Sequence, residues 1–138
     1  MPWAAFKVAF RLSSIKKANV HFTALFGGGA LFPSGEDSLF LSEIRQENLR
    51  IYVSSETIGK VTFDSSTWFT GYDEKYYFGK GAFYQVAHKR TFWIWMQYFL
   101  FRTRKFGSLT RKQKKYWIKQ GRKAFKQGKS FEEFTKQQ

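Results

Sequence analysis

The sequence predicts an α/β protein, which within these 138 residues reduces to α+β, and three observations support this prediction. Before residue 72, short runs of β-branched and aromatic residues flank a single amphipathic helical pattern, whereas from residue 74 the helical period continues almost to the end. Apolar residues make up 43% of the chain, which is enough for a folded core. Two or three short strands cannot form a stable sheet alone, so we expect them to be the end of a larger sheet.

The first half mixes strands and helices around a glycine-rich loop, FGGGALFPSG. Ser34 is the expected N-cap of the helix that follows, because Glu36 and Asp37 then fall in the first turn, where the helix dipole favours carboxylates. In order, the expected elements are a strand at 4–12, a short helix at 13–18, the loop, a helix ending near residue 48, and strands at 50–53 and 60–63.

The second half predicts helices at 74–88, 91–105 and 110–127, with Gly107 breaking the chain before the third. Within that third helix, Trp117, Gly121 and Phe125 fall on one face and basic residues cover the others. Ser130 with Glu133 forms a capping-box pattern and predicts a short final helix.

Charge divides the chain into two predicted parts. Residues 1–72 contain seven Lys/Arg and six Asp/Glu, whereas residues 73–138 contain seventeen and four. A part with this excess attracts an anionic partner such as nucleic acid, a phospholipid surface or a phosphorylated substrate. A merely solvated basic face is the alternative, but large aromatic residues are interleaved with the charges, and such a face has no need of them.

Several kinds of site are absent from the sequence. There is no Cys, and two isolated histidines, His21 and His88, cannot form a His-rich zinc site. Phe32 replaces the third glycine of a dinucleotide-binding loop, GKGA at 79–82 lacks the Ser/Thr of a P-loop, and no D-x-D occurs. The start lacks a signal-peptide pattern, and the longest apolar run, 92–101, is far short of the roughly 20 residues that span a bilayer. We therefore expect an intracellular chain that does not span the membrane.

The two acids of SGED at 34–37 are the candidate catalytic residues. Helical spacing places Asp37 on the face of Phe40 and Ile44, whereas Glu36 falls on an outward acidic face. A carboxylate at a helix N-terminus, beside apolar side chains and a glycine loop, is well placed to act as a general base. The alternative, an ordinary capping acid, is favoured by spacing alone.

A long co-linear pattern resembles a known family. The strings FGGGALFPSGEDSLFLSEIRQENLRIYVSSETIGKV and DSSTWFTGYDEKYYFGKGA are similar to the C-terminal portion of bacterial family 2 glycosyltransferases that build capsule, O-antigen or other surface polysaccharide. The resemblance covers roughly residues 6–106. It departs from the family at Thr23 and Ala24, where acidic residues are common, so we assign no function to those two positions.

The resemblance implies a GT-A fold, a nucleotide-sugar donor and a divalent cation, Mg²⁺ or Mn²⁺, in the complete enzyme. It implies that Asp37 is the catalytic base of an inverting transfer and that Glu36 is a neighbour that contacts the acceptor. Substrate-binding positions would be Gly28 and Gly29 of the loop, together with the family's "STW" segment at Ser66, Thr67 and Trp68.

The chain departs from the family by lacking the nucleotide-binding half and its D-x-D metal motif. We therefore expect residues 1–72 to be the end of a catalytic domain and 73–138 a basic aromatic helical tail. By itself the chain would bind no metal and would be inactive, with the N-terminal half supplied elsewhere. The acceptor would be a glycan or a lipid-linked glycan at the inner face of the cell membrane, with the tail from residue 108 holding the enzyme at an anionic surface.

A small basic nucleic-acid-binding module is the alternative function. The charge of the second half and its aromatic residues favour it. The sequence contains no recognition-helix, RNP or zinc pattern, and the acidic SGED helix has no purpose in such a module. Nucleic acid is therefore the disfavoured partner.

Overall fold

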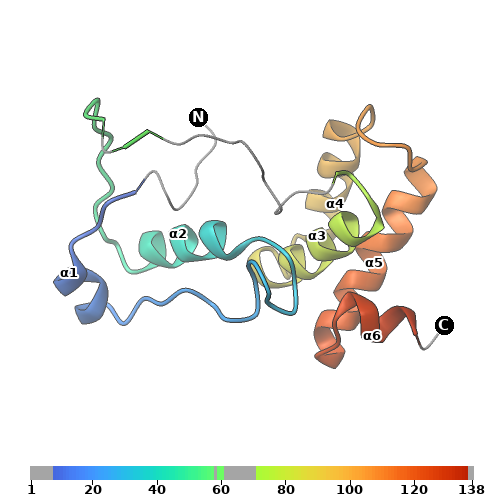
Figure 1. Ribbon diagram of the computed structural model, residues 1–138, viewed down its shortest axis with the longest axis horizontal. Coiled ribbons are helices and arrows are strands. Elements are labelled where there is room, and N and C mark those ends of the chain that lie inside the picture. Colours follow the sequence, from blue (N-terminus) through green and yellow to red (C-terminus); the bar gives the residue numbers. More distant parts are fainter. Residues whose placement is uncertain (1–7, 58, 61–70, 137–138) are drawn as a thin grey trace.

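The computed structural model describes residues 8–57, 59–60 and 71–136, and this part of the chain is helical (Figure 1). Helices α1 and α2 lie at one end of the longest axis, and the other four helices gather at the opposite end. The six helices are α1 (Leu12–Lys17), α2 (Glu36–Gln46), α3 (Glu74–Ala87), α4 (Phe92–Arg102), α5 (Arg111–Gln127) and α6 (Phe131–Thr135).

The predicted α/β fold, with the sheet of a GT-A transferase, is wrong for the residues that the structure describes. Residues 50–53, expected as a strand, run without a partner strand, and Val53 is 98% exposed. The described part of the expected strand at 4–12 also has no sheet partner, and residues 61–63 of the last one lie outside the described residues. A strand is stable only when its backbone pairs and one face is buried, and here helices make the core instead.

Helices α3 and α5 pack against each other within the group of four helices, and two glycines bring them into close contact. A Cβ atom added to Gly81 would lie 2.0 Å from the backbone oxygen of Ile118, and one added to Gly121 would lie 1.8 Å from that of Phe78. Real Cβ atoms do not approach oxygen so closely, so each glycine lets the backbone of the partner helix occupy the space of its missing side chain. The sequence placed Gly121 on the apolar face of α5, and the structure confirms this position.

The ends of the last two helices agree with the sequence. The Thr110 hydroxyl accepts a hydrogen bond from the Gln113 N–H at the start of α5, and Ser130 does the same for Glu133 at the start of α6. Both ends are reciprocal capping boxes, which satisfy two otherwise unpaired N–H groups each. Gly107, at φ +69°, lies in the connection between α4 and α5, where a break in the helical pattern was expected.

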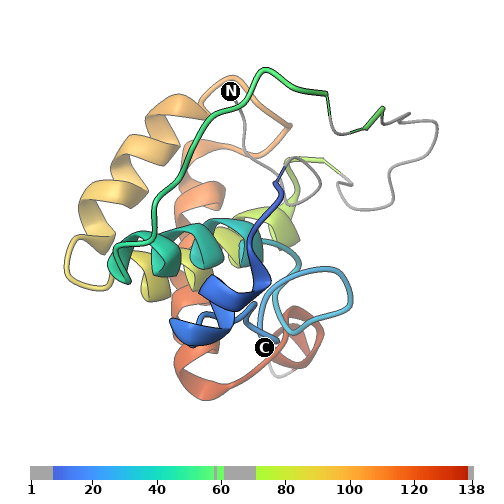
Figure 2. The ribbon, with the colours of Figure 1, turned by 90° about the vertical axis from the view of Figure 1, so that its left-hand side faces the viewer.

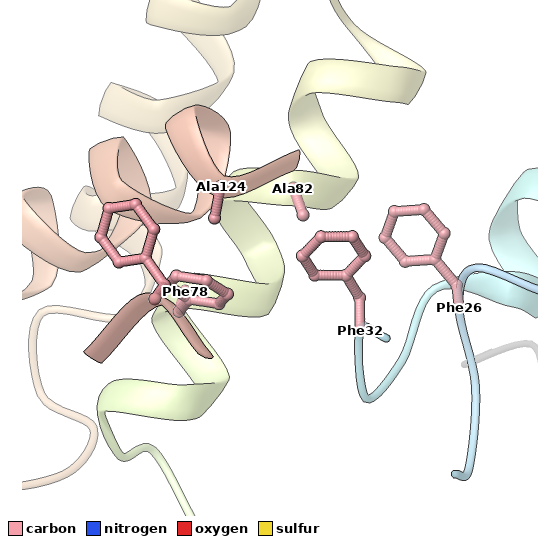
Figure 3. Packing of buried hydrophobic residues seen from close by; sticks show 6 residues of the cluster. Phe26, Phe32, Phe78, Ala82 and Ala124 are labelled. Carbon is pink, nitrogen blue, oxygen red and sulfur yellow. The ribbon is translucent and has the colours of Figure 1, made fainter. Parts of the chain in front are cut away.

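Three clusters of buried side chains hold the helices together. One joins α3, α5 and α6 to the glycine-rich loop, and Figure 3 shows Phe26 and Phe32 of that loop pointing toward Phe78, Ala82 and Ala124. A second joins α3, α4 and α5 around Tyr77, Met96 and Ile118, and a third packs α1 on α2. The loop before α2 therefore has a fixed base on the helical core.

Candidate functional site: the glycine loop and the first turn of α2

The glycine-rich loop is a short excursion closed at its base by hydrogen bonds. The Gly27 N–H donates to the Phe32 carbonyl at 2.9 Å, and the Phe32 N–H donates to the Leu25 carbonyl at 3.0 Å. Phe26 and Phe32 are buried, whereas Gly28 and Gly29 between them are exposed. The two predicted substrate-binding glycines therefore form the accessible tip of a loop whose base is anchored in the core.

Helix α2 begins directly after this loop, and its N-cap is Gly35, one residue later than the predicted Ser34. Gly35 adopts φ +126°, and a Cβ atom there would lie 2.7 Å from the Phe83 ring, so the position requires glycine. No side chain caps this end of α2, and the Glu36 Oε2 atom instead accepts a hydrogen bond from the Gly35 N–H at 2.9 Å. Asp37 follows in the same turn and is half-buried.

Glu36 faces the loop, although spacing predicted that it would point outward with Glu43 and Glu47. A Cβ atom added to Gly27 would lie 3.3 Å from the Glu36 Cδ atom, so this carboxylate lies against the loop backbone. The hydrogen bond to the Gly35 N–H explains this orientation, because it holds the Glu36 carboxylate back at the start of the helix, where the loop ends. The Glu36 carboxylate therefore lies beside the glycine loop, and Asp37 follows it in the first turn of α2.

Lys80 of α3 is the residue of this site that sequence reasoning missed. Burial lowers the pKa of Lys80 below its ordinary value, and the negative charge of Glu36 acts in the opposite direction. The Lys80 ammonium also lies over the rings of Tyr76 and Phe83, at 5.4 and 5.5 Å from their centroids. The sequence signal that could have indicated it is a lysine between two glycines, GKGA at 79–82, within an aromatic helix. This string was considered above only as a P-loop.

The structure does not describe the remaining predicted substrate-binding residues. Ser66, Thr67 and Trp68 lie outside the described residues, so their place relative to Asp37 stays a prediction. Within the described ranges, no group of three or more His, Asp or Glu residues could hold a metal ion. The described carboxylates therefore do not fit the divalent cation that the resemblance implies, and we assign no step of a reaction to such an ion here.

Two further findings bear on the class of protein. Among the described residues, every helix is too short or too polar to cross a membrane. Comparisons with protein-family models, with curated proteins and with solved structures gave no match.

Proposed function

We propose that this chain supplies the acceptor-side segment of an inverting glycosyltransferase, with Asp37 as the general base. The observation that carries the proposal is the placement of Glu36 and Asp37 in the first turn of α2, directly after an anchored glycine loop, with the Glu36 carboxylate against the loop backbone at Gly27. A positioned carboxylate can accept the proton of an acceptor hydroxyl, and the tip of the loop at Gly28 and Gly29 is exposed. The co-linear sequence pattern across residues 6–106 supports the same assignment.

In the proposed reaction, Asp37 removes the proton of an acceptor hydroxyl as that oxygen attacks the anomeric carbon of the sugar. The new C–O bond forms as the bond to the nucleoside diphosphate breaks, and the diphosphate leaves with the bonding electron pair. Glu36, fixed by its bond to Gly35, contacts the acceptor from the loop side. Binding of the donor diphosphate is left to a part of the enzyme other than the described residues.

We place this transfer at the inner face of the cell membrane, with a glycan or lipid-linked glycan as acceptor. The support is the basic second half, because Lys and Arg near an anionic surface each contribute about 1 kcal/mol to binding. Residues 108–138 include α5, which packs in the core against α3, so deleting this segment would remove part of the fold. Point substitutions on the surface are therefore the suitable test of location.

The Asp37→Asn substitution tests the chemistry. We expect transfer to fall by about 100-fold or more, which is the contribution of a positioned general base, with the helical circular dichroism unchanged. The measurement is incorporation of labelled sugar from a panel of nucleotide sugars into lipid-extractable and polysaccharide product. It uses membranes of cells in which the variant replaces the wild-type chain.

Two companion variants make the test specific. Glu36→Gln should lower transfer less than Asp37→Asn, because Glu36 moves no proton in the proposed reaction. Glu43→Gln, an acid two turns further along α2, should leave transfer unchanged. An Asp37→Asn enzyme that keeps more than about a tenth of the wild-type rate would rule out the general-base role.

A further inference from the structure

Helix α4 is apolar on the side that faces the core and also on the side that faces away from it. Phe92, Met96 and Leu100 point inward and are each 1% exposed. On the opposite side, Ile94 is 70% exposed, Phe101 62% and Tyr98 53%. A helix that is apolar all round is normally covered on all sides, by protein or by lipid. Figure 2 shows α4 at the edge of the molecule with no other element on its outer side.

The outward residues form one stripe. Positions 94, 98 and 101 follow the spacing that keeps side chains on one helix face, and Trp93 extends the stripe at its N-terminal end. We call Trp93, Ile94, Tyr98 and Phe101 the outer stripe of α4. Gln97 is a polar residue of the same face and falls between Trp93 and Phe101. No acidic residue occurs from residue 75 to residue 131, a segment that includes 16 Lys and Arg residues.

Cations border the outer stripe at both ends. At the N-terminal end, the Arg122 and Lys119 side chains lie over the Trp93 ring, 5.2 and 5.5 Å from its centroid. Lys123 and Lys126 complete a hollow of about 270 Å³ around this ring. At the C-terminal end, Arg104 lies over Phe101 at 4.5 Å from the ring centroid.

A second hollow, of about 650 Å³, opens at this C-terminal end and is lined by aromatic rings together with three cations, Arg102, Arg104 and Lys105. None of its lining residues belongs to the glycine loop or to α2. Each end of the apolar stripe therefore has a concave basic surface of a size and charge suited to phosphate groups.

We propose that the outer stripe of α4 docks on an anionic phospholipid bilayer, with α4 lying in the plane of the interface. The stripe would enter the boundary between headgroups and acyl chains, where Trp and Tyr are enriched, and the two basic hollows would receive lipid phosphates. Long Lys and Arg side chains at the edges of such a stripe can reach the headgroups while their methylene groups stay on apolar surface. The helix is 11 residues long, so it lies on the membrane and does not cross it.

Charge and apolar character together favour a bilayer over a second copy of the chain or a nucleic acid as the partner of the outer stripe. A second copy docked through the same face would bring two cation-bordered stripes together, which like-charge repulsion opposes. Nucleic acid would use the cations and stack on the rings, but it has no use for the exposed aliphatic side chain of Ile94. A bilayer uses the apolar stripe and the basic border together.

The test uses the full chain and vesicles alone, so its outcome is independent of whether the transferase proposal holds. Binding is measured by co-sedimentation with vesicles of phosphatidylcholine and with vesicles that contain about one-third phosphatidylglycerol. We expect binding to the anionic vesicles and little to the neutral ones. The double variant Ile94→Gln/Phe101→Gln should bind at least about tenfold more weakly, because it removes the apolar contribution and leaves every cation in place.

A matched control is available at the other end of the molecule. Ile51 and Val53 are also exposed, in a segment that Figure 1 places far from α4, so Ile51→Gln/Val53→Gln should bind like the wild type. Brominated lipids provide a second readout, since they quench tryptophans that enter the membrane. Because the chain has five tryptophans, the part of the quenching that Trp93→Phe removes reports on Trp93. Equal binding of the two double variants, absence of quenching, or tighter binding to a single-stranded oligonucleotide than to anionic vesicles would overturn the proposal. The proposal would also be overturned if the wild type forms a dimer and does not bind vesicles, and if the Ile94→Gln/Phe101→Gln variant no longer forms that dimer.

Discussion

Lys114 shows how a single charged side chain can be part of the core. It is 2% exposed, and its ammonium donates hydrogen bonds to the Thr103 carbonyl at 2.8 Å and the Phe106 carbonyl at 2.7 Å. These carbonyls follow the C-terminus of α4, where the helix dipole favours a positive charge. Helical spacing assigned Lys115, Lys119, Arg122 and Lys126 to the faces of α5 away from Trp117 and made no assignment for Lys114, so its burial is a finding of the structure.

We expect Lys114→Met to lower the free energy of unfolding by about 2 kcal/mol, because two buried carbonyls lose their donor. The measurement is urea denaturation followed by circular dichroism. The neighbouring Lys115 is exposed, so Lys115→Met should stay within about 0.5 kcal/mol of the wild type. Equal stability of the two variants would show that the buried ammonium contributes nothing.

The raised pKa values of two tyrosines of α3 predict how the free energy of unfolding changes at alkaline pH. Burial, reinforced by the neighbouring Tyr72 and Tyr77, raises the pKa of Tyr76 to about 12, and burial also raises the pKa of Tyr84. Between pH 10 and about 12 the folded chain therefore retains protons that the unfolded chain has lost, so stability present below pH 10 is lost as the pH rises. The lowered pKa of Lys80 acts in the opposite direction, because the fold disfavours its charged form.

Tyr76→Phe and Tyr84→Phe should each make the fall in the free energy of unfolding between pH 10 and about 12 less steep, because the substituted residue has no proton to lose. Urea denaturation across this range measures the slope. Tyr52→Phe is the control, since Tyr52 is 77% exposed. If the free energy of unfolding falls as steeply with pH in all three variants as in the wild type, burial of Tyr76 and Tyr84 does not cause the loss of stability at alkaline pH.

At the scale of elements, the crossing of α3 and α5 depends on close backbone contact rather than on large side chains. Alanine favours a helix over glycine by about 1 kcal/mol, so propensity alone predicts that Gly121→Ala stabilises α5. The contact at 1.8 Å predicts the reverse, because the two helices would have to separate.

We expect Gly121→Ala to cost about 3 kcal/mol or more, or to prevent folding, as overpacking against backbone does. Thermal unfolding and soluble yield provide the measurement. Gly128→Ala is the matched change at the end of the same helix, where φ is +64° and no atom lies within 4 Å of the added Cβ. It should cost about 1 kcal/mol from backbone strain alone. A Gly121→Ala protein as stable as the wild type would contradict the crossing described above.

At the scale of the whole molecule, charge is concentrated on one part of the chain. The 16 cations between residues 75 and 131, with no acid among them, repel one another when the chain is compact. Raising the salt from about 0.01 M to about 1 M KCl shortens the screening length from about 30 Å to about 3 Å.

We therefore expect the melting temperature to rise with KCl. Relief of about 1 kcal/mol of repulsion corresponds to about 4 °C for a domain of this size. Circular dichroism at several KCl concentrations measures the effect. A melting temperature that falls steadily with KCl would show that attractive pairs outweigh the repulsion.

The sequence by itself determined the elements that local chemistry specifies. Capping boxes at Thr110 and Ser130, glycine at position 107 and the 3.6-residue period predict helices within a few residues of where the structure has them. It also determined that Glu36 and Asp37 occupy the first turn of a helix after a glycine loop, and how unevenly charge is distributed.

Only the tertiary structure decided which surfaces meet. The short apolar runs read as strands, but a strand is defined by a partner elsewhere in the chain, and residues 50–53 have none among the described residues. In the same way, the charge interaction of Lys80 on α3 with Glu36 on α2 depends on how these two helices pack, and the burial of Lys114 depends on how α5 packs against the end of α4. The outer stripe of α4 has the same origin, because periodicity shows that a helix is apolar on two sides but not which side another helix covers.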